Sequence, residues 1–125
     1  NLDVIFSMTL DQIKQIERRG EERNPVLQPE SKLSHRHLDG EVSVTIVDIT
    51  FFGVYLKLHQ LEQLDFVSQH PRDLALHLVD EEGEFKIECL IFDATEQGLR
   101  ILFKHGSFEI ADRLTRFIER QKLAN

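Results

Sequence analysis

The sequence lacks any apolar run of about 18 or more residues, so it predicts no helix long enough to cross a lipid bilayer. It also lacks the basic start and apolar stretch of a secretory signal peptide. The first residue is Asn1 instead of Met, which leaves open a processed chain or a domain cut from a longer protein. We therefore expect a protein that does not span the membrane.

Cysteine is scarce. The chain has one cysteine, Cys89, which cannot form an internal disulfide. It lies within the run 87–91, where apolar residues dominate, so we predict a core residue instead of a reactive thiol. A chain without disulfides fits a reducing compartment, and we expect it in the cytoplasm.

Basic residues are fewer than acidic ones. The chain has 15 Lys and Arg against 22 Asp and Glu, and its net charge is -7. Binding to a nucleic acid polymer requires a basic surface, so this class of partner is disfavoured. A small anionic ligand remains possible if arginines gather locally.

The residues that are present fit one globular domain of 125 residues, with 41% hydrophobic and 30% charged residues. A capping box that begins at Thr9 predicts a helix over 10–18, which Gly20 ends. The segment 21–39 contains two prolines and little periodicity, so we expect a loop with an extended piece near Val26.

From Val42 onward the pattern changes to that of strands. Alternating apolar and β-branched residues predict strands at 42–49, 54–58, 74–79, 85–92 and 99–103. The segment 61–72 indicates at most a helical turn. Ser107 is a suitable N-cap for an amphipathic helix over 108–122. Short strands in series and one closing helix predict a small β-barrel with a helix packed on it.

Three arginines lie close together near the N-terminus, at Arg18, Arg19 and Arg23. Guanidinium groups suit bidentate bonds to phosphate oxygens and to the acceptor edge of guanine. The alternative is a plain surface cluster beside acidic neighbours. Arg116 and Arg120 repeat the Arg-x-x-x-Arg spacing within the last predicted helix, where we expect a solvated face.

A second group of candidate residues lies at the end of the first predicted strand and the start of the next, at Asp48, Thr50 and Gly53. Asp48 can accept hydrogen bonds from Arg or from a guanine N–H, and Thr50 offers a hydroxyl to a phosphate or base. Gly53 permits a turn with positive φ or the close approach of a ligand to the backbone. The alternative is a β-turn with a capping Asp and no ligand.

Together and in this order, the two groups resemble the motif of PilZ domains. That family has Arg-x-x-x-Arg in a flexible N-terminal segment, followed by (Asp/Asn)-x-Ser-x-x-Gly on the barrel. Arg19 and Arg23 match the first part, and Asp48, Thr50 and Gly53 match the second. The resemblance extends over about 16–121, and it includes the segment after Gly53, the last strand and the closing helix.

The resemblance implies an all-β fold with flanking helices, a six-stranded antiparallel barrel with a C-terminal α-helix and a short N-terminal helix. The PilZ-like domain is expected at 16–125, after an extension over 1–15. It implies a bacterial receptor that binds cyclic diguanylate (cyclic di-GMP), carries no catalysis or cofactor, and signals to a partner protein or neighbouring domain. Without the nucleotide, the same fold could serve as a protein-interaction module.

The resemblance also implies residue roles. Arg19 and Arg23 are assigned to phosphates and guanine faces, Asp48 and Thr50 to a guanine edge, and Gly53 to the turn. The family usually has Ser at the position of Thr50. Thr keeps the hydroxyl but adds a methyl group and a preferred rotamer, so binding is expected to survive in a weaker form. Arg18 is an additional donor, which favours a stacked dimer of the ligand.

Two other kinds of site have little support in the sequence. His35 and His37 could bind a metal, but no cysteine or carboxylate cluster completes a site, so we expect none. No Ser-His-Asp or Cys-His arrangement is evident from spacing, which disfavours an enzyme. The acidic run 80–82 is expected at a solvated hairpin tip.

Overall fold

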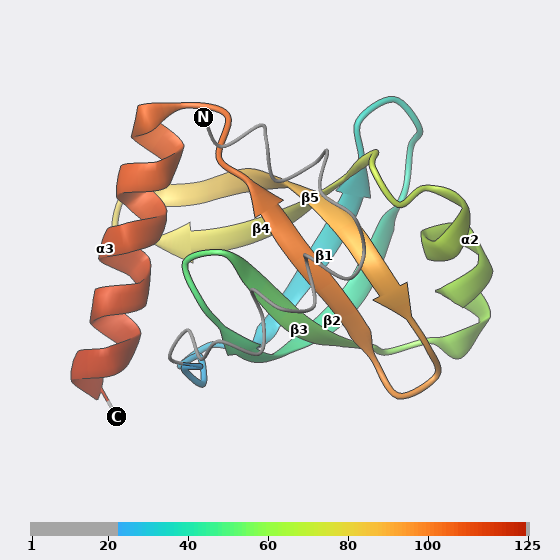
Figure 1. Cartoon of the computed structure of the whole chain (residues 1–125), viewed down its shortest axis with the longest axis horizontal. Coiled ribbons are helices and arrows are strands. Elements are labelled where there is room, and N and C mark those ends of the chain that lie inside the picture. The colour runs from blue at the N-terminus through green and yellow to red at the C-terminus, as the bar shows by residue number, and fades with distance from the viewer. Residues whose placement is uncertain (1–22, 125) are drawn as a thin grey trace.

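The computed structural model describes residues 23–124, and six of its segments are strands that close into a barrel (Figure 1). The strands are β1 (Glu30–His35), β2 (Glu41–Ile49), β3 (Gly53–Leu58), β4 (Leu74–Asp80), β5 (Gly83–Ala94) and β6 (Leu99–Lys104). Their order around the barrel is β1-β2-β3-β6-β5-β4, and every neighbouring pair is antiparallel. The predicted barrel is therefore confirmed.

The helices lie on the outside of this barrel. The short η2 (Leu61–Gln63) and α2 (Leu64–Gln69) connect β3 to β4, and α3 (Phe108–Ala124) follows β6. In Figure 1, α3 and α2 lie on opposite sides of the barrel. Neither α2 nor α3 is both long and apolar enough to cross a bilayer. The predicted helix over 10–18 lies outside the described residues.

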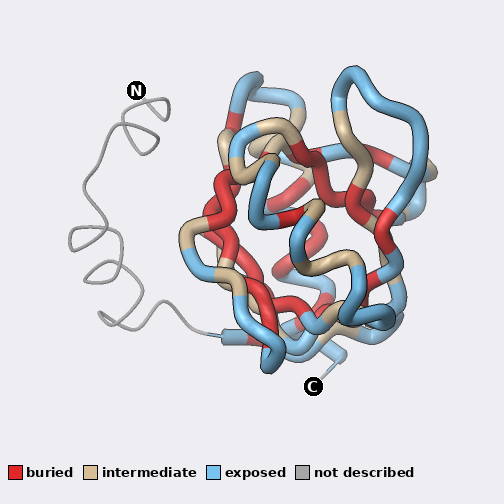
Figure 2. Tube along the Cα trace, turned by 90° about the vertical axis from the view of Figure 1, so that its right-hand side faces the viewer, coloured by how far each residue is buried: buried red, intermediate tan, exposed pale blue. Residues whose placement is uncertain are grey.

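The core sits inside the barrel because inward and outward residues alternate along each strand. In β2, for example, Val42, Val44 and Ile46 are buried. Cys89 is fully buried in this core, as predicted, and burial raises the pKa of its thiol to about 12. In Figure 2 buried residues lie mainly along the strands of the barrel, and exposed residues lie mainly in the connecting loops.

The prediction of a loop over 21–39 was wrong for its second half, which forms β1. Only one apolar residue of β1, Leu33, points into the core, so the strand has no alternating pattern to detect. Its strand conformation comes from backbone pairing with β2 on one side and β4 on the other. Tertiary pairing thus outweighs local sequence preference here.

Helix α3 begins at the predicted cap, where the hydroxyl of Ser107 accepts a hydrogen bond from the Ile110 amide at 3.2 Å. It buries Leu114, Phe117 and Ile118 against the barrel. This apolar face covers the side of the barrel formed in part by Phe85, whose ring lies 6.4 Å from that of Phe117.

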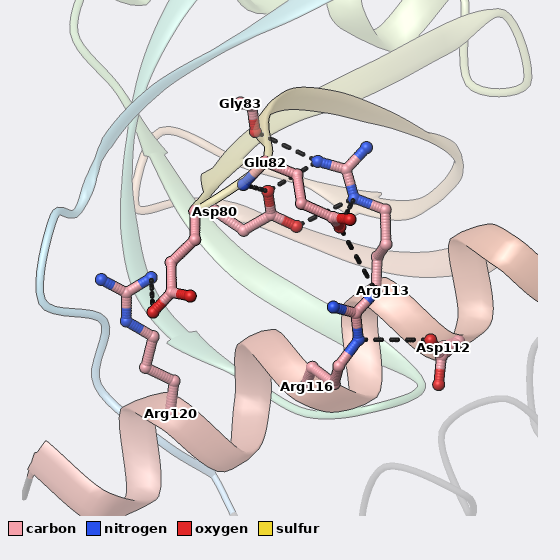
Figure 3. A network of polar contacts seen from close by, with 8 residues as sticks. Asp80, Glu82, Gly83, Asp112, Arg113, Arg116 and Arg120 are labelled. Atoms are coloured by element: carbon pink, nitrogen blue, oxygen red, sulfur yellow. Dashed lines mark hydrogen bonds and ion pairs between the residues drawn. The ribbon is translucent and has the colours of Figure 1, made fainter.

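A network of ion pairs fixes α3 to the hairpin between β4 and β5 (Figure 3). Arg113 donates two hydrogen bonds to Asp80, at 2.8 and 2.6 Å, and its guanidinium lies 4.4 Å from the ring centre of Phe85. Only 12% of the Asp80 side chain is exposed, so the prediction of a fully solvated hairpin tip was wrong for this residue. The bonds from Arg113 lower the pKa of the Asp80 carboxyl.

Arg116 and Arg120 lie further along the exposed face of α3, as predicted. Arg116 bonds to Asp112 within the helix and to Glu82 of the hairpin, at 3.2 and 3.3 Å. These side chains remain more than half exposed, so the Arg-x-x-x-Arg spacing in α3 marks a solvated surface.

Candidate functional site

The candidate site is formed where the segment before β1 runs beside the end of β2. Asn24 forms a two-way backbone bridge with Ile49, with N–H to carbonyl distances of 3.1 and 2.9 Å. The Asn24 side chain is buried and donates to the same Ile49 carbonyl at 3.4 Å. This bridge positions the residues on either side of it.

Arg23 and Asp48, each one residue from the bridge, are brought into contact. Nη1 of Arg23 lies 3.2 Å from Oδ1 of Asp48, although the two residues are 25 positions apart in sequence. The Arg23 side chain is 38% exposed and that of Asp48 is 22% exposed. The two candidate groups of the sequence therefore meet at a solvent-accessible ion pair. Arg18 and Arg19 lie outside the described residues.

Thr50 builds the turn that follows Asp48. Its hydroxyl oxygen accepts hydrogen bonds from the Phe52 and Gly53 amides, both at 3.1 Å. Its own amide donates to the Gly53 carbonyl at 2.8 Å. The hydroxyl oxygen of Thr50 therefore already accepts two hydrogen bonds within the turn, and a ligand would have to bind the same oxygen.

Gly53 does not have the positive φ that was one of the two options predicted for it. Its backbone instead lies against β6, and a Cβ at this position would come within 2.1 Å of the Ile101 carbonyl oxygen. The close approach that requires glycine is therefore between two strands. No side chain larger than hydrogen fits without moving the β3–β6 pair.

His105 lies beneath this turn and was not predicted from sequence. Its ring packs edge-on against Phe51, with 4.4 Å between ring centres, and 5% of the residue is exposed. Within the described part of the chain neither ring nitrogen has a partner in good hydrogen-bond geometry, although the Phe51 backbone lies close enough to favour the protonated ring in part. Burial lowers the pKa of His105 from its ordinary value of 6.5. A neutral imidazole thus supports the candidate turn.

The Asp-x-Thr-x-x-Gly pattern occurs a second time, as Asp93, Thr95 and Gly98 between β5 and β6. Thr95 forms the same turn: its hydroxyl accepts from the Gln97 and Gly98 amides at 3.2 and 3.3 Å. The repeated pattern is readable in the sequence once both turns are compared.

A cluster of two histidines and an aspartate at the end of β1 was not predicted from sequence, because His70 and Asp73 are distant from His35 along the chain. His35 Nε2 lies 3.3 Å from His70 Nδ1 and 4.0 Å from an Asp73 carboxylate oxygen. However, His35 Nδ1 accepts hydrogen bonds from the His37 and Leu38 amides, at 3.0 and 3.1 Å. Nε2 therefore carries the proton of neutral His35 and acts as a donor, which opposes metal coordination through that atom.

Ser34, His77 and Glu84 form a row that sequence spacing did not reveal. The Ser34 hydroxyl lies 2.7 Å from His77 Nε2, and Glu84 lies 3.1 Å from His77 Nδ1. The second contact is out of line for a hydrogen bond. Ser34 does not line the cavity that His77 and Glu84 border, so the row lacks a place for a substrate beside the hydroxyl.

No family model matches the sequence, and no curated protein matches it either. Among solved structures, the chain is similar to the crystal structure of the PilZ domain of CeSA from a cellulose-synthesizing bacterium. The TM-score is 0.59 at 10% sequence identity, over 82% of this chain and 96% of that chain. At this identity the likeness concerns the fold alone. The closed six-stranded antiparallel barrel with its C-terminal helix is a PilZ-like fold.

Proposed function

We propose that this chain is a bacterial receptor for cyclic diguanylate, acting in the cytoplasm without catalysis and passing its signal to a partner protein or neighbouring domain. The observation that carries the proposal is the contact between Arg23 and Asp48 at 3.2 Å, which joins the two halves of the sequence motif on one accessible surface. The PilZ-like fold supports it, because this is the fold that the sequence motif predicts.

The Arg23–Asp48 pair is the resting state of the proposed receptor. An exposed ion pair contributes about 0–1 kcal/mol, whereas charge-assisted hydrogen bonds contribute about 1.5–3 kcal/mol each. A ligand phosphate can therefore take Arg23 from Asp48, which leaves the carboxylate to accept guanine N–H groups. The exchange is favourable only if several such bonds form, because ordering a segment costs about 1–2 kcal/mol per residue.

The remaining roles follow from the motif. Arg19 is proposed to bind the phosphates together with Arg23, and Arg18 to add a donor that favours two stacked ligands. Thr50 and Gly53 contribute by fixing the turn that presents Asp48, since the Thr50 hydroxyl already bonds two backbone amides. Thr50 can contact a guanine edge only by sharing this oxygen.

Calorimetric titration with cyclic diguanylate tests the proposal. We expect binding to the wild-type chain, and a loss of about tenfold or more in affinity on Arg19→Ala or Arg23→Ala. Arg116→Ala is the matched control, because Arg116 has the same motif spacing to Arg120 but lies on the solvated face of α3. Equal losses at all three positions would contradict the assignment. Two ligands per chain would support the role of Arg18, and one would contradict it.

The second candidate is a PilZ-like interaction module that no longer binds the nucleotide. It is favoured by the engagement of the Thr50 hydroxyl within its own turn, where the oxygen already accepts two backbone amides. This candidate predicts no heat of binding and no thermal shift with cyclic diguanylate.

A further inference from the structure

A cavity of about 530 Å³ lies between the barrel and the C-terminal half of α3. Part of its wall is apolar and consists of buried side chains from β2, β4 and α3, namely Ile46, Leu78 and Phe117. Normal packing leaves few gaps larger than one water molecule, which occupies about 30 Å³ in the liquid. Neither Arg23 nor Asp48 lines the cavity, so the proposed nucleotide site does not account for it.

Two large apolar side chains at this cavity are in contact with water. Leu27 and Val79 both line the cavity, and they are 55% and 58% exposed. The other exposed large apolar residues of the described part lie singly on separate segments or at the two ends of α3. None of them lines the cavity: Leu38, Val47, Leu61, Phe108 and Leu123. An apolar occupant of the cavity would therefore cover two exposed apolar side chains at once.

The sequence before the described residues is rich in apolar side chains. Of residues 1–16, eight are Leu, Ile, Val, Phe or Met. Leu10, Ile13 and Ile16 recur at the spacing of one face of a helix. The motif of the proposed function begins only at Arg18, so it gives these apolar side chains no role.

The connection from this segment to the cavity is short. Because each residue extends the chain by at most about 3.6 Å, Val26 of the cavity wall lies within about 11 Å of Arg23. By the same measure Ile16 can reach about 25 Å from Arg23. The Leu27 amide donates to the Gln121 side chain of α3 at 2.8 Å, which fixes this part of the chain beside the cavity. A segment on so short a linker has an effective concentration in the millimolar range, at which even a weak contact forms.

We propose that the apolar face of residues 10–16 docks in this cavity of the same chain and covers Leu27 and Val79. Removal of apolar surface from water drives the contact. A second copy or another protein would have to bind from its free concentration, whereas the chain's own segment is always close by. The proposal does not depend on nucleotide binding.

Docking fixes both ends of the arginine segment. Asn24 is held by its bridge to Ile49, and Ile16 is held in the cavity. Residues 17–23 then form a short loop between two fixed points. Such a loop has less conformational freedom to lose when it binds a ligand. This benefit for the nucleotide rests on the proposed function, whereas the docking itself does not.

Paramagnetic broadening in methyl NMR spectra, recorded without nucleotide, tests the docking. A nitroxide label on Glu81→Cys stands at the cavity, because Glu81 lines it and its side chain is 83% exposed. Glu96→Cys is the matched control, since Glu96 is an exposed glutamate in the hairpin at the other end of β5. Cys89 is fully buried and does not take up the label. We expect the methyl signals of residues 10–16 to lose intensity with the label at position 81 and to keep it with the label at position 96.

A second pair of variants changes the cavity instead of the label. Leu27→Ser removes apolar surface from the cavity and should weaken docking about threefold or more, which restores part of the lost intensity. Leu61→Ser is its control, because Leu61 is 51% exposed and does not line the cavity, and it should restore none.

Equal intensities with the two labels, or a loss that Leu27→Ser does not reduce, would overturn the proposal. The labelled Glu81→Cys chain is also mixed with an isotope-labelled wild-type chain. A loss of the wild-type signals in this mixture would overturn the proposal in favour of a second copy as the occupant. Because no step uses cyclic diguanylate, failure of the docking would leave the proposed function to its own calorimetric test.

Discussion

Two hairpins of the barrel carry the same Asp-x-Thr-x-x-Gly pattern, Asp48–Gly53 between β2 and β3 and Asp93–Gly98 between β5 and β6. Both follow a register shift in the preceding strand, and both use the threonine hydroxyl to accept two backbone amides. In both, a glycine Cβ would collide with a carbonyl of the other hairpin. The pattern therefore encodes a way of turning a strand, whatever else it does.

The hairpins differ in the partner of the aspartate. Asp48 pairs with Arg23, which comes from the segment before the barrel and is 25 residues away. Asp93 instead lies 3.9 Å from Arg100 of the same hairpin, and that guanidinium lies over the Tyr55 ring. The same turn therefore forms with and without a contact to the segment before the barrel. What distinguishes the first hairpin is the contact of its aspartate with Arg23.

The largest effect is expected at the two glycines. Gly53→Ala should lower the free energy of unfolding by about 3 kcal/mol, because its Cβ would lie 2.1 Å from the Ile101 carbonyl oxygen, which is fixed in a strand pair. Gly98→Ala should cost less, since the contacts are longer, at 2.6 and 2.7 Å, and the Tyr55 side chain can move in part. Urea unfolding measures both.

Gly106→Ala is the control for these variants, because a Cβ there meets no atom within 4 Å. It should change stability by less than about 0.5 kcal/mol. Similar losses of unfolding free energy at Gly53 and Gly106 would show a general effect of replacing glycine. The close approach of β3 and β6 would then not be the reason that position 53 requires glycine.

Replacing the aspartate of each hairpin tests whether only the first hairpin contributes to ligand binding. Asp48→Ala should weaken cyclic diguanylate binding by about tenfold or more if the proposed function holds, because it removes the acceptor for guanine N–H groups. Asp93→Ala should leave the affinity within about twofold, since its arginine lies on the same hairpin. Calorimetric titration of both variants with cyclic diguanylate gives the ratio of their affinities. Equal affinities would mean that the first hairpin is as structural as the second.

The barrel could be predicted from sequence because its longer strands alternate clearly, as in Val42, Val44 and Ile46. β1 could not, because a strand with one inward apolar residue, Leu33, takes its conformation from its neighbours. The sequence also pointed to Arg23 and Asp48, although their contact depends on the Asn24–Ile49 bridge, which has no sequence signature.

Other features of the site depend on packing that no local pattern records. The need for glycine at position 53 comes from a strand that follows almost fifty residues later, and the support by His105 comes from the end of β6. The histidine cluster around His35 likewise assembles from separate segments. The sequence indicated which charged and polar side chains could bind a ligand, and the fold determines which of them are in contact, as Arg23 and Asp48 are.

The threonines test whether the two turns are equivalent. Thr50→Val should cost about 1–2 kcal/mol of unfolding free energy, because the Phe52 and Gly53 amides lose their acceptor. Thr95→Val should cost less, because Thr95 and the neighbouring Glu96 and Gln97 are exposed and water can replace the hydroxyl. Thermal unfolding compares them. Thr50→Ser should restore stability, and failure of this rescue would mean that the methyl group, instead of the hydroxyl, supports the turn.

The smallest expected effect is a pH dependence of stability that involves only the first hairpin, because its Phe51 ring packs against His105. The corresponding residue of the second hairpin, Glu96, is exposed. Burial holds the pKa of His105 below its ordinary value of 6.5, so as the pH falls the unfolded chain is protonated at this residue before the folded chain is. Stability contributed by neutral His105 is complete above about pH 6.5 and declines as the pH falls toward the folded pKa.

Urea unfolding between about pH 5 and pH 7.5 should therefore show a slope for the wild-type chain that His105→Leu reduces. His37→Leu is the control, because His37 is exposed. Hydrogen exchange adds the comparison between hairpins: acid should speed exchange at the Phe52 and Gly53 amides relative to those of Gln97 and Gly98, after correction for intrinsic rates. Equal acceleration in both hairpins, or a slope unchanged by His105→Leu, would show that His105 does not support the first turn, and the hairpins would then differ only in the partner of their aspartate.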